Sequence, residues 1–316
     1  MPVNSTLAFV FPGQGSQKIG MLAELANDNP LILSTFREAS EVLAYDVWDL
    51  IQNGSQDDIN LTERTQPILL TASVALWRVW GEKQAQLPAL LAGHSLGEWS
   101  ALVCAGVIDF ADAVNLVRLR GKYMQETVPQ GQGAMAAIIG LDDAAAALCC
   151  EEASQGEEVK PVNFNAPGQV VIAGASEAVD RAIVLCKAAG AKRALPLAVS
   201  APFHTLLMKP AADKLALDVA QLEFRAPQIP IVQNVHCKVE NDSVSIQKQV
   251  IEQIYHPVHW VNCVKTLIEH GVTSTVECGP GKVLCGLNKR IDKSLQLFST
   301  DQPENLAQAL LAVGES

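Results

Sequence analysis

The sequence predicts an α/β protein in which a parallel sheet carries helices on both faces and a smaller unit is inserted. Strand-like and helix-like patterns alternate along most of the 316 residues. Such alternation is typical of parallel sheets, because each return to the sheet needs a crossover connection. Hydrophobic residues make up 49% of the chain and charged residues 18%, which excludes a disordered or collagen-like chain. A chain of this length can bury a large core.

The first predicted strand leads into a glycine-containing loop. Residues 6–11 (TLAFVF) form a short apolar strand, and residues 12–17 (PGQGSQ) form the loop. The further elements predicted before residue 107 are helices over 29–43 and 66–80, a strand over 87–92 and a helix over 98–106.

An amphipathic helix is predicted over 109–124, with Asp109 as its N-cap. Arg118, Arg120 and Lys122 lie near the C-terminal end of this helix, where the helix dipole stabilises positive charge. This position alone gives Arg120 a purely structural interpretation.

Residues 129–200 are predicted to form a compact inserted unit. A cluster of helix breakers at 129–133 is followed by patterns in the order β-α-β-β-α-β, which is the split βαβ, ferredoxin-like arrangement. We therefore expect a large α/β domain over 1–128 and 201–316 and a small ferredoxin-like domain over 129–200. The strands predicted in the small domain cover 134–141, 159–164, 169–173 and 194–199.

Charge and cysteine usage exclude several classes of protein. The net charge of −11 argues against nucleic acid as a partner. No run of about twenty apolar residues suggests a membrane span, and residues 1–5 lack the basic region of a signal peptide. We therefore expect a cytoplasmic protein without membrane association. The eight cysteines have no C-x-x-C spacing, so reduced core thiols are expected rather than a zinc site.

The glycines after the first strand only partly match a dinucleotide-binding motif. Gly13 and Gly15 have the spacing of its first two glycines, but the third would fall at Lys18. No P-loop motif occurs either, so nucleotide binding is not expected. The loop still lies at the carboxyl end of a strand, the usual place for ligand contacts in an open α/β sheet.

Residues 93–97 (GHSLG) form a G-x-S-x-G motif between the predicted strand 87–92 and the helix-prone stretch 98–106. This context is that of a nucleophile elbow, in which Ser95 sits on a sharp strand-to-helix turn. Gly93 and Gly97 allow the backbone to approach itself closely. The helix N-terminus behind Ser95 offers N–H groups to a developing oxyanion.

A serine nucleophile needs a base, and the chain has six histidines. His94 adjoins Ser95, but neighbouring side chains in such a turn point apart. His204 lies where the chain re-enters the large domain, and we expect it to overhang a cleft between the two domains. Position alone leaves open whether His204 is the base that Ser95 needs. The other four histidines, at 236, 256, 259 and 270, lie in ordinary strand or helix patterns.

Seven motifs in one order resemble the malonyl-CoA:acyl-carrier-protein transacylases of bacterial type II fatty acid synthesis, whose large domain is α/β-hydrolase-like. The resemblance covers about residues 6 to 292, and acyltransferase domains of polyketide synthases share most of it. The motifs are FPGQGSQ (11–17), GHSLGE (93–98), LRGKYM (119–124), AMAAI (134–138), NFN (163–165), SAPFH (200–204) and ECGPG (277–281).

This resemblance implies catalytic roles for three residues. Ser95 would be the nucleophile, and His204 would be the general base and later the general acid. The backbone carbonyl of Gln253 would orient the histidine, giving a dyad rather than a Ser-His-Asp triad.

The resemblance also implies a set of substrate contacts. Backbone N–H groups of Gln14 and Leu96 would form the oxyanion hole, and Arg120 would bind the free carboxylate of a malonyl group. The ring of Phe203, beside His204, would disfavour branched acyl groups. Two further residues, Asn163 and Asn234, are candidates for lining the cleft.

The implied reaction moves malonyl from malonyl-CoA to the phosphopantetheine thiol of acyl carrier protein through a malonyl-serine ester. Both half-reactions exchange thioester and ester, so no metal or redox cofactor is needed.

Three other functions stay open. An α/β serine hydrolase shares the elbow, but its histidine falls late in the chain, after an acidic residue. A separate polyketide-synthase acyltransferase would use the same chemistry in another pathway. A non-catalytic binding module is disfavoured, because Ser95, His204 and Arg120 are all present.

Overall fold

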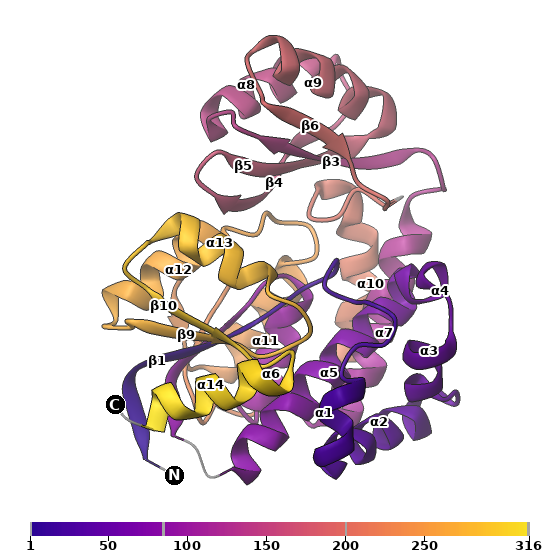
Figure 1. Ribbon diagram of the computed structural model, residues 1–316. Helices are drawn as coiled ribbons and strands as arrows, with labels where there is room; N and C mark the ends of the chain where they lie inside the picture. The colour runs from indigo at the N-terminus through magenta and orange to yellow at the C-terminus, as the bar shows by residue number, and fades with distance from the viewer. Residues whose placement is uncertain (1, 84–85, 200, 315–316) are drawn as a thin grey trace.

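The computed structural model describes residues 2–83, 86–199 and 201–314 (Figure 1). Within them, two separate sheets form. Sheet A has the spatial order β10 (Gln296–Ser299), β9 (Ser274–Glu277), β1 (Val3–Phe11), β2 (Leu87–Gly93), β7 (Ile231–Val232) and β8 (Val239–Glu240). Sheet B has the order β4 (Val159–Ala166), β5 (Gln169–Ala175), β3 (Gly133–Ile139) and β6 (Arg193–Pro196).

Sheet A is parallel except at one edge, where β8 runs antiparallel to β7. Its central strand β1 is buried on both faces. Leu7 and Phe9 belong to one core cluster, and the alternating Ala8 and Val10 belong to another. Successive side chains of a strand point to opposite faces, so the unbroken apolar run of β1 reflects helices on both sides. The predicted α/β class is confirmed.

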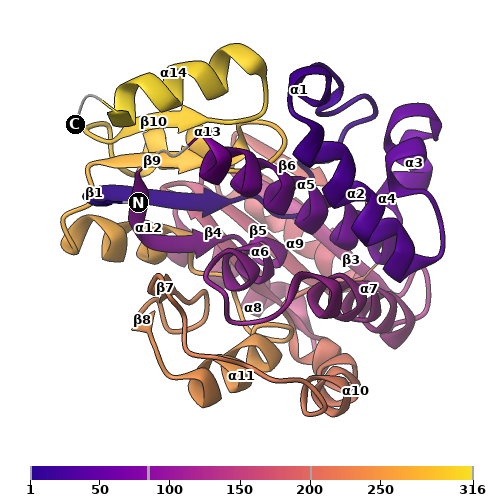
Figure 2. The same ribbon diagram turned by 90° about the horizontal axis from the view of Figure 1, so that it is seen from below.

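Helices surround sheet A, and α14 lies beside the edge strand β10 (Figure 2). Among the described residues, no helix is long and apolar enough to cross a bilayer. The helices outside the inserted segment are α1 (Ala23–Asp28), α2 (Pro30–Leu43), α3 (Val47–Asn53), α4 (Gln56–Asn60), α5 (Thr62–Glu82), α6 (Leu96–Cys104), α7 (Phe110–Thr127), η1 (Leu206–Met208), α10 (Lys209–Val219), α11 (Ser243–Glu252), α12 (Trp260–Glu269), α13 (Val283–Ile291) and α14 (Pro303–Gly314).

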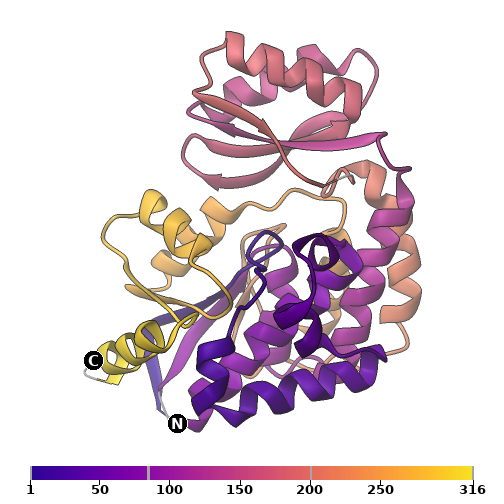
Figure 3. The same ribbon diagram turned by 45° about the vertical axis from the view of Figure 1, so that its right-hand side comes forward.

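Sheet B has the predicted β-α-β-β-α-β order, with α8 (Asp143–Ser154) and α9 (Ser176–Ala188) as its helices. All its neighbouring strands are antiparallel, and β5 separates β3 from β4, which makes this a split βαβ unit. Both helices cover the face of sheet B that is turned away from sheet A (Figure 3). The other face of sheet B therefore looks toward the carboxyl ends of β1 and β2.

The chain leaves for sheet B from α7 and returns into α10, and these two helices pack against each other. Adjacent exit and entry points are what an inserted unit requires. The domain limits at 128/129 and 200/201 remain a prediction, within which sheet B and its helices span 133–196. Ser200, the first residue of the SAPFH motif, lies outside the described residues, as do residues 1, 315 and 316.

The end of one predicted strand needs correction. The last strand of sheet B ends at Pro196 rather than at residue 199. The Leu197 N–H still donates to the Met135 carbonyl, but the Val199 N–H donates back to the Leu197 carbonyl, so the chain turns away from β3 there. Asp109 is the N-cap of α7, as predicted, although its side chain makes no capping hydrogen bond. Its carboxylate instead accepts a hydrogen bond from Arg225.

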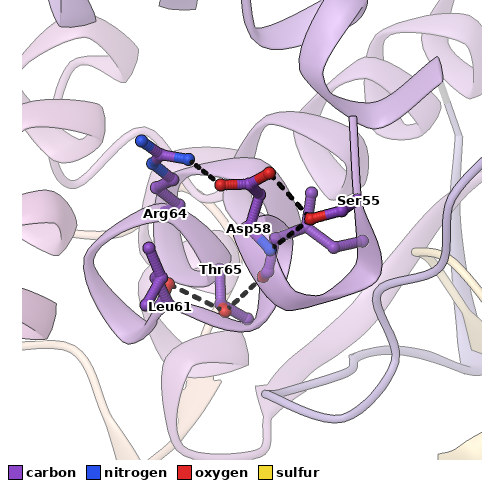
Figure 4. A network of polar contacts seen from close by, with 6 residues as sticks. Ser55, Asp58, Leu61, Arg64 and Thr65 are labelled. Carbon is purple, nitrogen blue, oxygen red and sulfur yellow. Dashed lines mark hydrogen bonds and ion pairs between the residues drawn. The ribbon is translucent and has the colours of Figure 1, made fainter. Parts of the chain in front are cut away.

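A compact polar network sets the start of α5 (Figure 4). Ser55 caps α4 by accepting from the Asp58 N–H, and the Asp58 carboxylate binds both the Ser55 hydroxyl and Arg64. The Thr65 hydroxyl donates to the carbonyls of Ile59 and Leu61. These bonds fix the turn between α4 and α5, and Thr65, which makes two of them, directly precedes Gln66 in α5.

Candidate active site

Ser95 sits on a sharp turn between β2 and α6. Its backbone has φ 51° and ψ −107°, a sparsely populated conformation for a non-glycine residue. The Ser95 N–H donates to Asn234 Oδ1 (2.8 Å), and the Gly97 N–H donates to the His94 carbonyl (2.9 Å). A Cβ on Gly97 would lie 2.0 Å from the Phe11 carbonyl oxygen. The turn is therefore pressed against the end of β1, where only glycine fits.

Ser95 and His204 are within hydrogen-bond distance. Ser95 Oγ lies 2.8 Å from His204 Nε2, and His204 Nδ1 lies 2.8 Å from the backbone oxygen of Gln253. A carbonyl oxygen can only accept, so Nδ1 carries the ring proton and Nε2 presents its lone pair to the serine hydroxyl. Burial, reinforced by the Arg120 charge, lowers the pKa of His204 to about 3. The imidazole is therefore neutral at pH 7 and able to accept a proton.

Arg120 lies in the same buried place. Its Nη1 donates to Gln66 Oε1 (2.9 Å), and its Nη2 donates to Gln253 Oε1 (2.9 Å) and to Ser95 Oγ (3.3 Å). Only 2% of the residue is exposed. Burial lowers its pKa to about 10, which nearby Glu98 partly opposes, so the guanidinium stays charged at pH 7.

The helix-end interpretation of Arg120 is wrong. The α7 helix continues to Thr127, so Arg120 lies about two turns before its end, beyond the reach of the terminal dipole. The sequence pattern placed the end of the helix too early.

Glu98 and Asn234 support the turn from behind. Glu98 Oε2 accepts from the Asn234 N–H (2.7 Å), and Asn234 Nδ2 donates to the Gly93 carbonyl (2.6 Å). Burial raises the pKa of Glu98 to about 8. Asn234 is fully buried and does not line the cavity. The expectation that it lines the cleft is therefore wrong, because its amide is used to hold the elbow.

The candidate oxyanion-hole residues flank Ser95. Gln14 and Leu96 both line the cavity in front of it. Leu96 is the first residue of α6, where a helix has free N–H groups. Neither backbone N–H has an acceptor in the part of the chain that the structure describes. Both groups are therefore available to a ligand.

Ser95 lines a cavity of about 270 Å³ between the two sheets. Its polar end is formed by Ser95, His204, Arg120 and Gln66, and Phe203 lies beside the histidine. The wall from the inserted segment is mainly apolar. It includes Met135, Ala137, Val171, Leu197 and Val199, with the polar side chains of Asn163, Asn165 and Gln169.

His94 also lines this cavity but is turned away from the dyad. Its Nε2 lies 2.8 Å from Asn165 Oδ1 on β4, and its ring packs against Trp260. His94 thus links the elbow to sheet B.

Sequence reasoning missed Gln66, Glu98 and the side chain of Gln253. Gln66 lies in a helix whose pattern gives no hint of function. Glu98 could have been found, since a carboxylate three residues after an elbow serine lies in an apolar stretch. Gln253 was singled out for its backbone only.

The parallel sheet, the serine elbow and the paired histidine are typical of α/β enzymes that form acyl-serine intermediates. The comparisons define this class further. Residues 8–285 match the family described as the acyl transferase domain. A "Malonyl CoA-acyl carrier protein transacylase" of Salmonella typhimurium is 59% identical over 303 residues, which cover 96% of this chain and 98% of the relative. One from Bacillus subtilis is 43% identical, covering 98% of each chain.

Solved structures agree with these relatives. An acyl carrier protein S-malonyltransferase from Vibrio cholerae is 58% identical, has a TM-score of 0.94, and covers 96% of this chain and 99% of its own. A malonyl-transacylase in complex with a type II polyketide carrier protein is 56% identical, with a TM-score of 0.96 and coverage of 97% and 99%. The chain belongs to the malonyl CoA-acyl carrier protein transacylases within the acyl transferase family.

Replacing Gly97 by alanine should destabilise the protein, because the new Cβ would collide with the Phe11 carbonyl. We expect the free energy of unfolding, measured by urea denaturation, to fall by about 3 kcal/mol. Gly286→Ala is the matched control, since this exposed glycine in α13 has open space around it. That variant should gain roughly 0.5–1 kcal/mol. Equal stability of Gly97→Ala and the wild type would contradict the close approach.

Glu98→Gln should flatten the dependence of stability on pH. The pKa of Glu98 is raised from 4.5 to about 8 in the folded protein, so the native state binds more protons than the unfolded state between these values. The contribution of Glu98 is therefore present below about pH 4.5 and is lost as the pH rises toward 8. Denaturation across this window checks it. An exposed control, Glu41→Gln in α2, should keep the wild-type slope, and an unchanged slope in Glu98→Gln would refute the assignment.

Proposed function

We propose that this protein transfers the malonyl group of malonyl-CoA to the phosphopantetheine thiol of acyl carrier protein, in the supply of fatty acid synthesis. The observation that carries this is the hydrogen-bonded pair of Ser95 and His204 with the buried cation of Arg120 beside it. The similarity to transacylases named for malonyl-CoA and acyl carrier protein supports malonyl-CoA as the substrate and the carrier protein as the acceptor.

In the first half-reaction, Ser95 Oγ attacks the thioester carbonyl carbon of malonyl-CoA while His204 Nε2 takes the hydroxyl proton. The N–H groups of Gln14 and Leu96 bind the resulting oxyanion. The carbon–sulfur bond then breaks, and His204 returns the proton to the sulfur of coenzyme A. A malonyl ester of Ser95 remains.

The second half-reaction reverses these steps with a different thiol. The carrier thiol gives its proton to His204 Nε2 and attacks the ester carbonyl. Ser95 Oγ leaves and recovers the proton, and malonyl-carrier is released. The orienting bond from His204 Nδ1 to the Gln253 carbonyl is kept throughout.

Pairing between Arg120 and a malonyl carboxylate would have two effects, one on substrate binding and one on the protonation of His204. A planar guanidinium can bind a carboxylate with two parallel hydrogen bonds. The same carboxylate offsets the positive charge that disfavours protonation of His204. A neutral acyl group provides neither effect and leaves the cation unpaired, so the site discriminates against it.

Two further assignments belong to this proposal. The ring of Phe203, at the cavity wall beside His204, would disfavour substituents on the α-carbon of the acyl group.

The eight cysteines are all free, as expected in a reducing compartment, and this supports a cytoplasmic location.

Mixing the protein with malonyl-CoA should add one malonyl group to Ser95, seen by intact-mass spectrometry. Addition of carrier protein should then remove it and yield malonyl-carrier rather than free malonate. Ser95→Ala should lose the adduct and several orders of magnitude in rate, as expected when a serine nucleophile is removed. Equal labelling of the variant, or release of free malonate as the main product, would overturn the proposal and favour a hydrolase.

Arg120→Ala should cut malonyl transfer but spare or improve acetyl transfer. A hydrogen bond to a charged group contributes about 1.5–3 kcal/mol, which corresponds to a loss of roughly ten- to more than a hundredfold in kcat/KM. Arg120→Lys should recover only part of it, because an ammonium lacks the planar fork. Arg118→Ala, on the same helix but bonded to Asn115, is the control and should leave both rates unchanged. Equal losses for both substrates in Arg120→Ala would mean that Arg120 is structural.

A further inference from the structure

Gln253 is completely buried and is hydrogen-bonded to Ser95, Arg120 and His204. Its backbone oxygen faces His204 Nδ1, while its side chain makes a separate set of bonds. The amide oxygen accepts from Arg120 Nη2 (2.9 Å), and the amide nitrogen donates to the Ser95 carbonyl (2.9 Å). One carboxamide thus joins the cation to the main chain of the nucleophile turn.

We propose that the side chain of Gln253 is a positioning residue that sets the preference of this site for malonyl over neutral acyl groups. It does so by holding the Arg120 guanidinium at a fixed place relative to Ser95. This inference rests on the proposed function and goes beyond it, because there Gln253 acts only through its backbone.

The spacing between cation and nucleophile matters because a malonyl group is short and stiff. A single methylene separates its carboxylate carbon from the thioester carbonyl carbon. The carboxylate can pair with Arg120 while the carbonyl meets Ser95 Oγ only if the two protein groups keep a set separation, which is 3.3 Å between Nη2 and Oγ. A small misplacement of reacting groups has large effects on rate.

A neutral amide is suited to this task. An ionised carboxylate in the place of the Gln253 amide would pair with Arg120 and compete with the substrate. An apolar side chain would leave Nη2 without its buried acceptor, at the cost that an unsatisfied charged donor carries. The amide oxygen satisfies the guanidinium without neutralising it, so the positive charge remains available to malonyl.

Gln66 offers an internal comparison. Its amide oxygen binds the other terminal nitrogen of Arg120, but no bond links its side chain to the nucleophile turn among the described residues. Gln66 therefore helps to satisfy the cation, whereas Gln253 also ties it to Ser95.

The test compares wild type, Gln253→Met, Gln253→Glu and Gln66→Met in steady-state transfer from malonyl-CoA and from acetyl-CoA to the carrier protein. All variants keep the backbone carbonyl at 253, and methionine has nearly the shape of glutamine. We expect Gln253→Met to lose at least about tenfold in malonyl kcat/KM, with a fall in kcat, while acetyl transfer changes much less. Gln66→Met should raise KM for malonyl-CoA with a smaller change in kcat.

Gln253→Glu provides a second reading should the methionine variant fold poorly, as judged by thermal unfolding. Its carboxylate should raise KM for malonyl-CoA further and leave acetyl transfer as the faster reaction. In Gln253→Met the pH profile of acetyl transfer should stay that of the wild type, because His204 keeps its backbone partner. In Gln253→Glu the new carboxylate offsets the Arg120 charge that disfavours protonation of His204, so its acetyl profile should shift toward a higher histidine pKa. Equal losses for the two substrates, a shifted acetyl profile in Gln253→Met, or unchanged malonyl kinetics would overturn the inference. A wild type that fails to form the malonyl-Ser95 adduct would instead defeat the proposed function.

Discussion

The close approach of the elbow to the end of β1 is the constraint on which the rest of the site depends. Gly93 and Gly97 have no room for a side chain, since a Cβ on either would lie about 2 Å from backbone atoms. This contact forces Ser95 into its unusual backbone conformation and aims its hydroxyl into the cavity. Asn234 stabilises this conformation, because its side chain accepts from the Ser95 N–H and donates to the Gly93 carbonyl. The position of Ser95 therefore sets the distances from its hydroxyl to His204 and Arg120.

Burial gives the site its electrostatic character. His204, Arg120 and Glu98 are all nearly inaccessible, and in each case the loss of water disfavours the charged form. The outcome differs with the starting pKa. The histidine and, at neutral pH, most of the glutamic acid are neutral, whereas the guanidinium remains charged. A single unpaired cation therefore stands beside a neutral base, which suits a substrate that brings its own carboxylate.

The two sheets contribute different chemistry to one cavity. Sheet A and its loops bring the polar groups that would react with or bind the acyl group, because the carboxyl ends of β1 and β2 meet there. The inserted unit brings a mostly apolar wall with three amides on β4 and β5. Apolar side chains on one side lower the local dielectric, which strengthens the electrostatic interactions on the other.

The sequence by itself determined the main elements before residue 200 and the candidate nucleophile, because these depend on local patterns. It predicted none of the strands β7 to β10, which complete sheet A. Neighbouring residues are enough to recognise apolar runs, glycine spacing and the G-x-S-x-G motif. The same holds for the β-α-β-β-α-β order of the insert. His204 and Arg120 were named through the family resemblance, since their positions alone left structural alternatives open. Only the tertiary structure decided which side chains meet. Gln66, Glu98, Asn234 and Gln253 come from four separate segments, and no local pattern records contacts formed by folding distant segments together.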